Sequence, residues 1–353
     1  MWVPPLIFER KAFLNRKKNP YFLHGEAEYF LAWRGSEPVG RITAMRDDQF
    51  NEFHDWNWGT FGFFEVLDDQ EAASALLDTA EKWVRDKGCD RLVGPMDFTM
   101  NDEVGILFEG FDLPPMLKQP WHPPYYQRLC EEHGLEKAQD LLMWNLEVGD
   151  RSKVLPIIDE LAQQVGPKHN ITIRHMDMKN LEQEIRGFVD VYNAAWKRNW
   201  GFVPISEAEL KQTAKDMKMV LDPDWTWAAE NERGETIGVA LTIPDYNQVF
   251  KKMNGRVLPF GWRHMIGAKR WIDRVRVGFL GVKPEYQHTG VAAGFFVEHF
   301  DQAIVRPQKW GEMGWILETN RAMNRGMESM GARIVKRYRI FERDLAQGVL
   351  TPG

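Results

Sequence analysis

Hydrophobic positions along the chain follow two different periods. Residues 274–282 (RVRVGFLGV) alternate as a half-buried β-strand does, whereas the apolar residues of 296–304 recur at the spacing of a helix face. The stretch 281–294 (GVKPEYQHTGVAAG) joins the two through a turn of small residues. This part of the chain therefore predicts a strand, a glycine-containing turn and a helix in succession.

Similar patterns occur twice along the chain. Residues 28–44 (EYFLAWRGSEPVGRITA) and 226–242 (TWAAENERGETIGVALT) each predict a strand, a polar turn and a second strand. Residues 127–138 and 324–335 each predict a short helix that ends at a glycine and is followed by a strand. Because both pairs repeat at nearly the same spacing, the sequence predicts two copies of one fold, with coincidental similarity as the alternative.

Length and composition agree with two domains. The chain has 353 residues, of which 44% are hydrophobic and 27% charged, and this is enough apolar material for two cores. A strand over 141–146 gives way to a new helix, which places the expected boundary there. We predict an α/β (mixed α+β) fold in which residues 1–148 and 149–353 each form a central mixed sheet flanked by helices.

The sequence also limits the compartment and the chemistry of the protein. No stretch approaches the roughly 20 apolar residues that cross a bilayer, and in residues 1–20 the apolar run precedes the basic cluster, the reverse of a secretory signal. Cys89 and Cys130 lack metal-binding or redox spacing and are interpreted as core thiols. We expect a cytoplasmic protein without disulfides or a bound metal.

The turn at 281–294 suits an anionic ligand. The start of a helix carries unpaired backbone N–H groups and the positive end of the helix dipole, so it attracts anions. Gly290 lets the main chain approach an anion closely, and Ala292 leaves room beside it. Dinucleotide-binding and Walker motifs need glycine spacings that are absent here. The turn predicts a pyrophosphate site, and a tight turn without a ligand is the alternative.

The residues of this turn resemble the acyl-CoA-binding motif of the GNAT superfamily of N-acyltransferases. That motif is Gln/Arg-x-x-Gly-x-Gly/Ala after a strand that ends in Gly-Val-x-Pro, and Gln287, Gly290 and Ala292 occupy its three positions. The resemblance covers most of residues 171–344. Residues 21–146 resemble a second GNAT-like copy, so the resemblance implies a tandem acyltransferase.

The first copy departs from the motif. After its predicted strand it reads QEAASA at residues 70–75, without a glycine and with Glu71 where phosphates would lie. The resemblance therefore implies that the first copy is a degenerate half and that the second copy binds acyl-CoA.

The resemblance implies that the cofactor is acetyl-CoA or a longer acyl-CoA. In the family, two splayed strands hold the pantetheine arm, and a backbone N–H near the strand end polarises the thioester carbonyl as an oxyanion hole. Leu280 and Val282 match that strand end. Helix capping is the alternative for Asn320. The residues expected to contact the cofactor are Leu280, Gly281, Val282, Gln287, His288, Thr289, Gly290, Val291, Ala292, Asn320 and Asn324.

Acyl transfer to an amine needs a base, because an alkyl amine has a pKa of about 10 and must be neutral to attack. Glu318, at the end of the strand after the cofactor helix, is the first candidate, and Tyr246 and His264 are weaker ones. A solvated strand-end charge is the alternative for Glu318. Met327 occupies the position where many family members have a tyrosine that protonates the departing thiolate, so solvent is expected to supply that proton.

Residues 246–276 form a basic segment. They contain eight Lys or Arg and one Asp, in a chain whose formal net charge is −6. Because aromatic and aliphatic residues are interspersed, the segment predicts either peripheral contact with anionic lipid at the inner membrane face or a lid over the acyl chain and the CoA phosphates. A solvated helix face is the third interpretation. Nucleic acid is not expected as a partner because the rest of the chain is acidic.

These observations predict an N-acyltransferase. It would move an acetyl or longer acyl group from acyl-CoA to the primary amine of a small molecule or lipid, by direct attack in a ternary complex. Long-chain acylation of an amphiphilic amine lipid and a catalytically weak acyl-CoA sensor are the alternatives. The acceptor, the acyl chain length and the oligomeric state do not follow from the sequence.

Overall fold

The computed structural model describes residues 1–147, 151–206, 208–210, 212 and 220–346. It divides into two compact units: unit 1 contains Met1–Val3, Glu9–Leu141 and the chain from Lys336 onward, and unit 2 contains Pro4–Phe8 and Leu142–Val335. The domain boundary expected at residues 148 and 149 lies outside the described residues. Each unit combines a mixed sheet with helices, so the expected α/β fold is confirmed.

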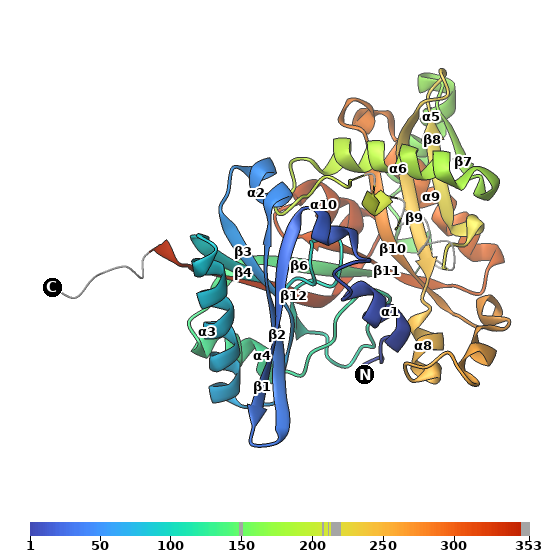
Figure 1. Ribbon diagram of the computed structural model, residues 1–353. Helices are drawn as coiled ribbons and strands as arrows, with labels where there is room; N and C mark the ends of the chain where they lie inside the picture. The colour runs from blue at the N-terminus through green and yellow to red at the C-terminus, as the bar shows by residue number, and fades with distance from the viewer. Residues whose placement is uncertain (148–150, 207, 211, 213–219, 347–353) are drawn as a thin grey trace. The chain divides into compact units, whose positions relative to one another are not determined.

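Both units contain helices and strands (Figure 1). The α-helices of the described residues are α1 (Ile7–Phe13), α2 (Asp48–His54), α3 (Gln70–Asp86), α4 (Tyr125–Glu132), α5 (Pro156–His169), α6 (Leu181–Trp196), α8 (Asn247–Met253), α9 (Val291–Val305) and α10 (Arg321–Ser329). The strands are β1 (Gly25–Arg34), β2 (Glu37–Asp47), β3 (Trp58–Val66), β4 (Arg91–Gly94), β5 (Ile106–Glu109), β6 (Glu136–Leu146), β7 (Thr172–His175), β8 (Thr226–Glu230), β9 (Thr236–Pro244), β10 (Arg274–Val282), β11 (Trp310–Leu317) and β12 (Arg333–Asp344). Among these elements, no helix is both long and apolar enough to span a bilayer.

The two units repeat one topology. In unit 1 the strands follow the order β1-β2-β3-β4-β12, with β5 also on β12, and in unit 2 the order β11-β10-β9-β8-β7. In each unit an antiparallel hairpin (β1–β2 or β8–β9) pairs with a third antiparallel strand, and a helix then leads to a parallel neighbour. The repeat expected from the two hairpin patterns and the two glycine-terminated helices is therefore present.

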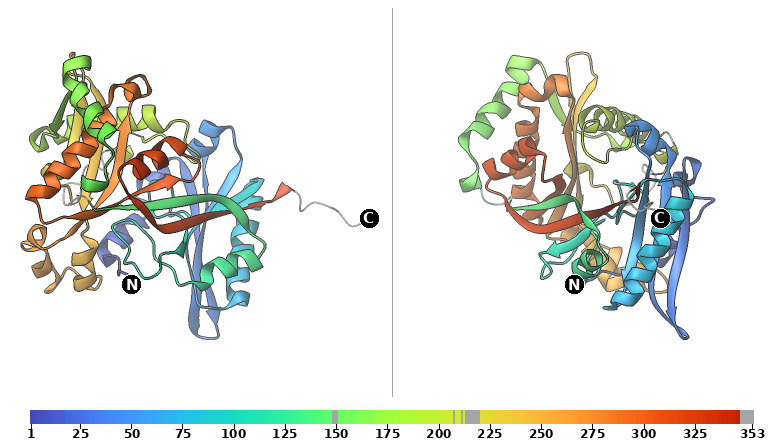
Figure 2. Two further views of the ribbon diagram at one scale, coloured as in Figure 1. Left: turned by 180° about the vertical axis from the view of Figure 1, so that it is seen from behind. Right: turned by 90° about the vertical axis from the view of Figure 1, so that its left-hand side faces the viewer.

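The core of unit 2 holds the strand–turn–helix segment in place. Helix α9 and helix α5 lie on one face of the sheet, and α6 lies on the other (Figure 2, right). The core includes two fully buried tryptophans, Trp225 and Trp227, together with apolar side chains from α9 and β10. Phe296, Phe300 and Ala303 lie on the buried face of α9, as the helical spacing predicted, whereas Ile304, which the same spacing included, is 66% exposed.

Unit 1 has its own core, between its sheet and the helices α3 and α4. Cys89 and Cys130 both lie in this core as free thiols. Burial raises the pKa of the Cys89 thiol to about 11 and that of Cys130 further. Both cysteines are therefore unreactive core residues, as the sequence predicted.

A buried histidine fastens α9 to β9. The Nδ1–H of His299 donates to the carbonyl of Phe295 at 2.6 Å, so the neutral ring accepts at Nε2 from the hydroxyl of Thr242 at 2.7 Å. Burial lowers the pKa of His299 to about 4. Protonation of this ring would remove the acceptor that Thr242 uses.

We expect this histidine to make unit 2 acid-sensitive. The folded pKa lies below the unfolded one, so the unfolded state takes up the proton first, and stability present above about pH 6.5 is lost as pH falls toward 4. The loss by pH 5 is about 2 kcal/mol. Urea unfolding at pH 7 and pH 5 measures it, and His299→Gln, which keeps an acceptor for Thr242, should lower the pH dependence by this amount. An unchanged pH dependence in the variant would contradict the assignment.

Candidate active site

The site is built around the turn between β10 and α9. After β10 ends at Val282, a 3-10 turn covers Pro284–Thr289, and Gly290 precedes the first residue of α9. Gly290 has φ +85°, a backbone conformation that side chains disfavour. A Cβ on Gly290 would also lie 2.6 Å from the backbone oxygen of Leu161 in α5. Two independent constraints therefore require glycine at the centre of the motif.

Side chains of the turn fix its shape from within. The amide of Gln287 donates to the carbonyl of Val282 at 3.2 Å, and the hydroxyl of Thr289 donates to the carbonyl of Tyr286 at 2.6 Å. The hydroxyl of Tyr286 accepts from the amide of Asn231, in the β8–β9 hairpin, at 3.1 Å. The turn is thus held in one conformation before any ligand arrives.

The first turn of α9 is open to an anion, whereas the corresponding helix of unit 1 is closed. Gly290 caps α9 without a side-chain hydrogen bond. In α3 the carboxylate of Asp69 accepts from the N–H of Ala72 at 3.1 Å, and Arg34 pairs with both Asp69 and Glu71. A carboxylate therefore already fills the N-terminus of α3, which supports the prediction that only the second copy binds CoA.

The strands next to the turn separate as the family resemblance implied. β10 pairs with β9 as far as Val282, but with β11 only as far as Val277. Backbone groups of residues 278–282 that face β11 therefore have no strand partner in the described part of the chain. Leu280 and Val282 lie in this stretch, so it presents the backbone donors that an oxyanion hole needs.

The other residues predicted to contact the cofactor fall into two groups. Gln287 and His288 are exposed, while Gly281, Thr289 and Val291 are buried and shape the turn. Asn320 caps α10 by accepting from the N–H of Met323 at 3.2 Å. The helix-capping alternative for Asn320 thus has a direct structural basis, and its contact with CoA stays a prediction.

Asn324 joins three segments near the end of β11. Its amide nitrogen donates to the carbonyls of Leu317 and Glu318, at 3.1 and 3.3 Å, and its oxygen accepts from the indole N–H of Trp144 at 3.0 Å. The side chain of Asn324 is therefore occupied in holding the residues that end β11, including the predicted base.

Of the three candidate bases, only Glu318 lies at the same end of the sheet as the turn. It follows β11 directly, and β11 runs parallel to β10. Tyr246 follows β9, whose end pairs with Val275 near the start of β10, roughly 23 Å along the strand from Val282. Tyr246 is buried, and burial raises the pKa of its hydroxyl. His264 is exposed in the segment between β9 and β10. The structure therefore does not bring Tyr246 or His264 to the turn.

Met327 is fully buried in the core of unit 2. It offers no proton donor at the position where many family members have a tyrosine.

Three residues that support the site were not singled out from the sequence. Leu161 lies against Gly290, Asn231 donates to Tyr286 and Trp144 donates to Asn324, each from a distant part of the chain. Nothing local marks them, because each role depends on which elements are neighbours in the folded chain.

Comparison with solved structures identifies the fold as that of the GNAT proteins. The chain aligns over 90% of its length with a GCN5-related N-acetyltransferase from Sphaerobacter thermophilus, covering 81% of that chain, with a TM-score of 0.52 and 13% identity. It aligns over 94% of its length with a tandem GNAT protein of the clavulanic acid biosynthesis pathway, covering 85% of that chain, with a TM-score of 0.53 and 10% identity. The fold is therefore the tandem GNAT fold, and the turn between β10 and α9 lies where the sequence resembles the acyl-CoA motif of that superfamily.

Two proteins are similar in sequence to almost the whole chain, although no family model matches it. The chain is 35% identical over 352 residues to the bacterial ceramide synthase of Caulobacter vibrioides, covering 98% of this chain and 90% of that protein. It is 32% identical over 350 residues to protein YghO of Escherichia coli, covering 98% of this chain and 88% of that protein. The chain belongs to the family of these two proteins.

Proposed function

We propose that the enzyme N-acylates an amphiphilic primary amine with a long-chain acyl group taken from acyl-CoA in unit 2. The observation that carries the proposal is an apolar and basic surface on the same unit, together with a relative that is named a ceramide synthase. An amphiphilic substrate resides in or at a membrane, so an enzyme that uses one gains from a surface that binds there.

The residues of the turn fit acyl-CoA as the acyl donor. An uncapped helix start, a glycine with positive φ and the separation of β10 from β11 supply what a pyrophosphate and an extended pantetheine arm require. Bound acyl-CoA would supply an activated thioester. We assign the pyrophosphate to the N–H groups at the start of α9 and the carbonyl oxygen to a backbone N–H of residues 280–282.

The amine attacks the thioester carbonyl directly. A carbon–nitrogen bond forms and the attacking nitrogen loses one proton to solvent, while the carbon–sulfur bond breaks and CoA leaves as a thiolate that takes a proton from solvent. An alkyl ammonium with a pKa of about 10 must first lose its proton, and Glu318 is the carboxylate at the correct end of β11 to accept it.

Glu318→Gln tests this role, since the amide cannot accept a proton. We expect kcat to fall at least tenfold, toward the hundredfold typical of a lost general base, while the affinity for CoA changes little. Partial recovery of kcat at higher pH would follow, because more of the amine is then neutral. The matched control is Glu328→Gln, an acidic residue on α10. Equal activity of Glu318→Gln and the control would remove Glu318 from the mechanism.

The surface proposed to face lipid comprises α1 residues and the segment after α8. Leu258, Phe260, Trp262 and Ile266 are 73%, 65%, 46% and 68% exposed. The N–H of Ile7 donates to the carbonyl of Gly255 at 2.9 Å, which brings the exposed Ile7 and Phe8 to the same segment. We call these six residues and the basic side chains around them, Lys251, Arg256, Arg263 and Arg270, the interfacial surface.

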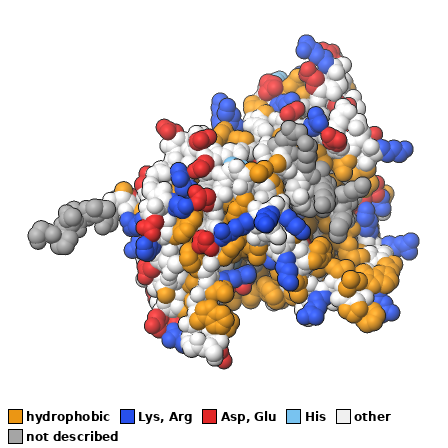
Figure 3. All heavy atoms as spheres, viewed as in Figure 1, with side chains coloured by type: hydrophobic (Ala, Val, Ile, Leu, Met, Phe, Trp, Pro, Cys, Tyr) orange, Lys and Arg blue, Asp and Glu red, His pale blue; other side chains and the backbone are white. Residues whose placement is uncertain are grey.

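Hydrophobic side chains gather among Lys and Arg at the lower right of Figure 3, where Figure 1 shows α8 and the segment that follows it. Contiguous exposed apolar residues are uncommon unless they meet a partner, and a basic rim favours an anionic one. We propose peripheral association with the anionic inner face of a membrane.

Release of free CoA tests the proposed reaction. The purified protein would be incubated with acetyl-CoA or palmitoyl-CoA, and with a small polar amine or a long-chain amine in vesicles. We expect turnover with the long acyl chain and the long-chain amine. Turnover only with acetyl-CoA and the polar amine would contradict the proposal in favour of small-molecule acetylation. Acyl-CoA binding without turnover would replace it with a sensor.

A further inference from the structure

An acyl chain that leaves the gap between β10 and β11 meets a different environment on each face of the sheet. On the α9 face, Leu280 and Val282 pack into the buried core of unit 2 beside Phe295, which is fully buried. Because protein cores are closely packed, a chain could enter on this face only by displacing core side chains. The chain of an acyl-CoA bound at the turn therefore continues on the opposite face, which α6 covers.

A bulge in β10 determines which of its residues face α6. β10 pairs with successive residues of β9 at Val277 and at Phe279, so Gly278 is an extra residue in β10. The positions that face the α9 core change from odd numbers before the bulge to even numbers after it. Phe279 and Gly281 consequently face α6. Phe279 directly precedes residues 280–282, to which the thioester carbonyl is assigned above.

Three aromatic side chains of α6 lie around the ring of Phe279. The centre of that ring is 4.8 Å from the ring of Phe188, 5.9 Å from that of Tyr192 and 5.1 Å from that of Trp196. The α6 residues recur every four positions and so share one side of the helix. Tyr192 is buried and its hydroxyl donates to the carbonyl of Val203 at 3.3 Å, whereas Phe188 and Trp196 are half-buried. We call Phe188, Tyr192, Trp196 and Phe279 the aromatic face.

Gly281 keeps the ring of Phe279 close to its own strand. A Cβ on Gly281 would lie 2.6 Å from Cζ of Phe279 and 3.5 Å from Cβ of Ala195 in α6. Glycine at this position thus leaves the space that the ring occupies between β10 and α6. The aromatic face therefore begins directly beside the backbone that the thioester would contact.

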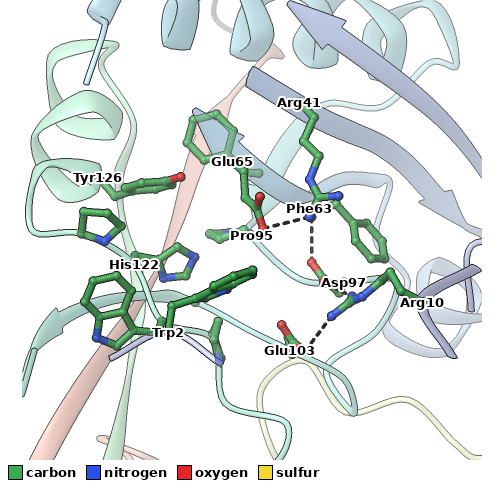
Figure 4. Close-up of a pocket in the computed structure, with 15 residues that line it drawn as sticks. Trp2, Arg10, Arg41, Phe63, Glu65, Pro95, Asp97, Glu103, His122 and Tyr126 are labelled. Atoms are coloured by element: carbon green, nitrogen blue, oxygen red, sulfur yellow. Dashed lines mark hydrogen bonds and ion pairs between the residues drawn. The ribbon is translucent and has the colours of Figure 1, made fainter. Parts of the chain in front are cut away.

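The cavity of unit 1 does not suit an acyl chain. It has a volume of about 240 Å³, and charged side chains contribute to its lining (Figure 4). Among these, Arg10 pairs with Asp97 at 3.2 Å and with Glu103 at 3.0 Å. Methylene groups cannot form hydrogen bonds, so a chain in this cavity would displace water from charged groups without replacing its hydrogen bonds. A chain on the aromatic face has no such cost.

We propose that the aromatic face binds the saturated chain of a long-chain acyl-CoA and thereby selects the acyl donor. The chain leaves the thioester on the α6 side of β10, passes the ring of Phe279 and covers the exposed parts of Phe188 and Trp196. Each methylene group that it buries raises the affinity about fourfold, so discrimination against acetyl-CoA grows with chain length. The position of the thioester rests on the proposed function, whereas the chain selectivity is measured by binding alone.

Calorimetric titration of the full chain with acetyl-CoA and with octanoyl-CoA, in the absence of lipid and amine, tests the site. Burial of about three methylene groups would raise affinity roughly sixtyfold, so we expect octanoyl-CoA to bind at least about tenfold more tightly than acetyl-CoA. Trp196→Ser and Phe279→Ser each remove apolar surface that the chain covers, and each should lower this octanoyl preference about fivefold. Lost packing alone would weaken both ligands equally, so only a contact with the chain changes the ratio of the two affinities.

The matched control is Trp310→Ser, which replaces a half-buried tryptophan at the start of β11. Trp310 lies opposite Arg274 at the first pair of β10 and β11, the end of the sheet remote from the turn, so this variant should keep the wild-type ratio. If Phe279→Ser fails to fold, Trp196→Ser decides the outcome, because Trp196 is the half-buried last residue of α6.

Equal binding of the two CoA esters by the wild type, or the wild-type ratio in folded Trp196→Ser, would overturn the proposal. Loss of the octanoyl preference in a variant with Phe260 and Trp262 changed to Ser would also overturn it, since the chain would then lie on the interfacial surface. Absence of CoA release with every amine, with the octanoyl preference and its loss in Trp196→Ser intact, would instead refute the proposed reaction and leave the chain site standing.

Discussion

Replacement of Gly290 by Asp is expected to lower the affinity of the protein for CoA at least a hundredfold, about 2.8 kcal/mol. The carboxylate would enter the place where the pyrophosphate meets the start of α9. At an effective dielectric constant of about 20, two unit charges about 4 Å apart repel by about 4 kcal/mol, so the estimate is conservative. Calorimetric titration with CoA measures the loss.

Gly290→Asp also strains the fold, since its Cβ would meet the backbone of Leu161. Ala292→Glu separates the two effects, because an acidic residue in the first turn of a helix is compatible with folding but still repels phosphate. The matched control is Ala75→Glu, at an exposed position of α3 in unit 1. If folded Ala292→Glu binds CoA as tightly as Ala75→Glu, the turn is not the pyrophosphate site.

The second large effect is expected on vesicle binding. Substitution of Leu258, Phe260, Trp262 and Ile266 by Ser should weaken binding to anionic vesicles of phosphatidylglycerol and phosphatidylethanolamine about a thousandfold. Half-burial of each side chain in the interface contributes about 1 kcal/mol, and the four together about 4 kcal/mol. Co-sedimentation with the vesicles measures the change, while the affinity for CoA should stay the same.

The matched control replaces four comparably exposed apolar residues of unit 1, Leu23, Leu31, Trp33 and Leu67, by Ser. A companion variant with Lys251, Arg256, Arg263 and Arg270 changed to Gln should bind less at low salt and differ little at high salt, because salt screens surface charge beyond roughly 8 Å. If the wild type does not sediment with these vesicles at any salt concentration, no lipid contact exists. Loss of CoA affinity in the basic variant would indicate a lid over the cofactor.

Much of the fold could be predicted because its information is local. The alternation in β10, the helical spacing in α9 and the glycine between them are properties of adjacent residues, and backbone geometry turns them directly into strand, turn and helix. The repeat was visible for the same reason, since each hairpin and each glycine-terminated helix is a local pattern.

The candidate site was predictable in part. The turn with Gln287 and Gly290 is one continuous stretch of chain, so its residues identify it. The choice among Glu318, Tyr246 and His264 was not decidable from the sequence, because it depends on strand direction. Because β10 and β11 are parallel, Glu318 lies at the same end of the sheet as the turn. Because β9 and β10 are antiparallel, Tyr246 lies at the opposite end of the sheet.

The sequence by itself thus determined the tandem α/β fold, the glycine-containing turn between β10 and α9, and the excess of basic residues in 246–276. Only the tertiary structure decided which of those basic residues are buried: the side chain of Arg274 is 11% exposed and pairs with Asp245 at 2.6 Å, and Arg276 is 6% exposed. Only the tertiary structure brought Arg10, Asp97 and His122 to one cavity. Composition and spacing specify what a segment can form, whereas contacts between distant residues depend on how strands pair and helices pack, and these arrangements are set by the whole core at once.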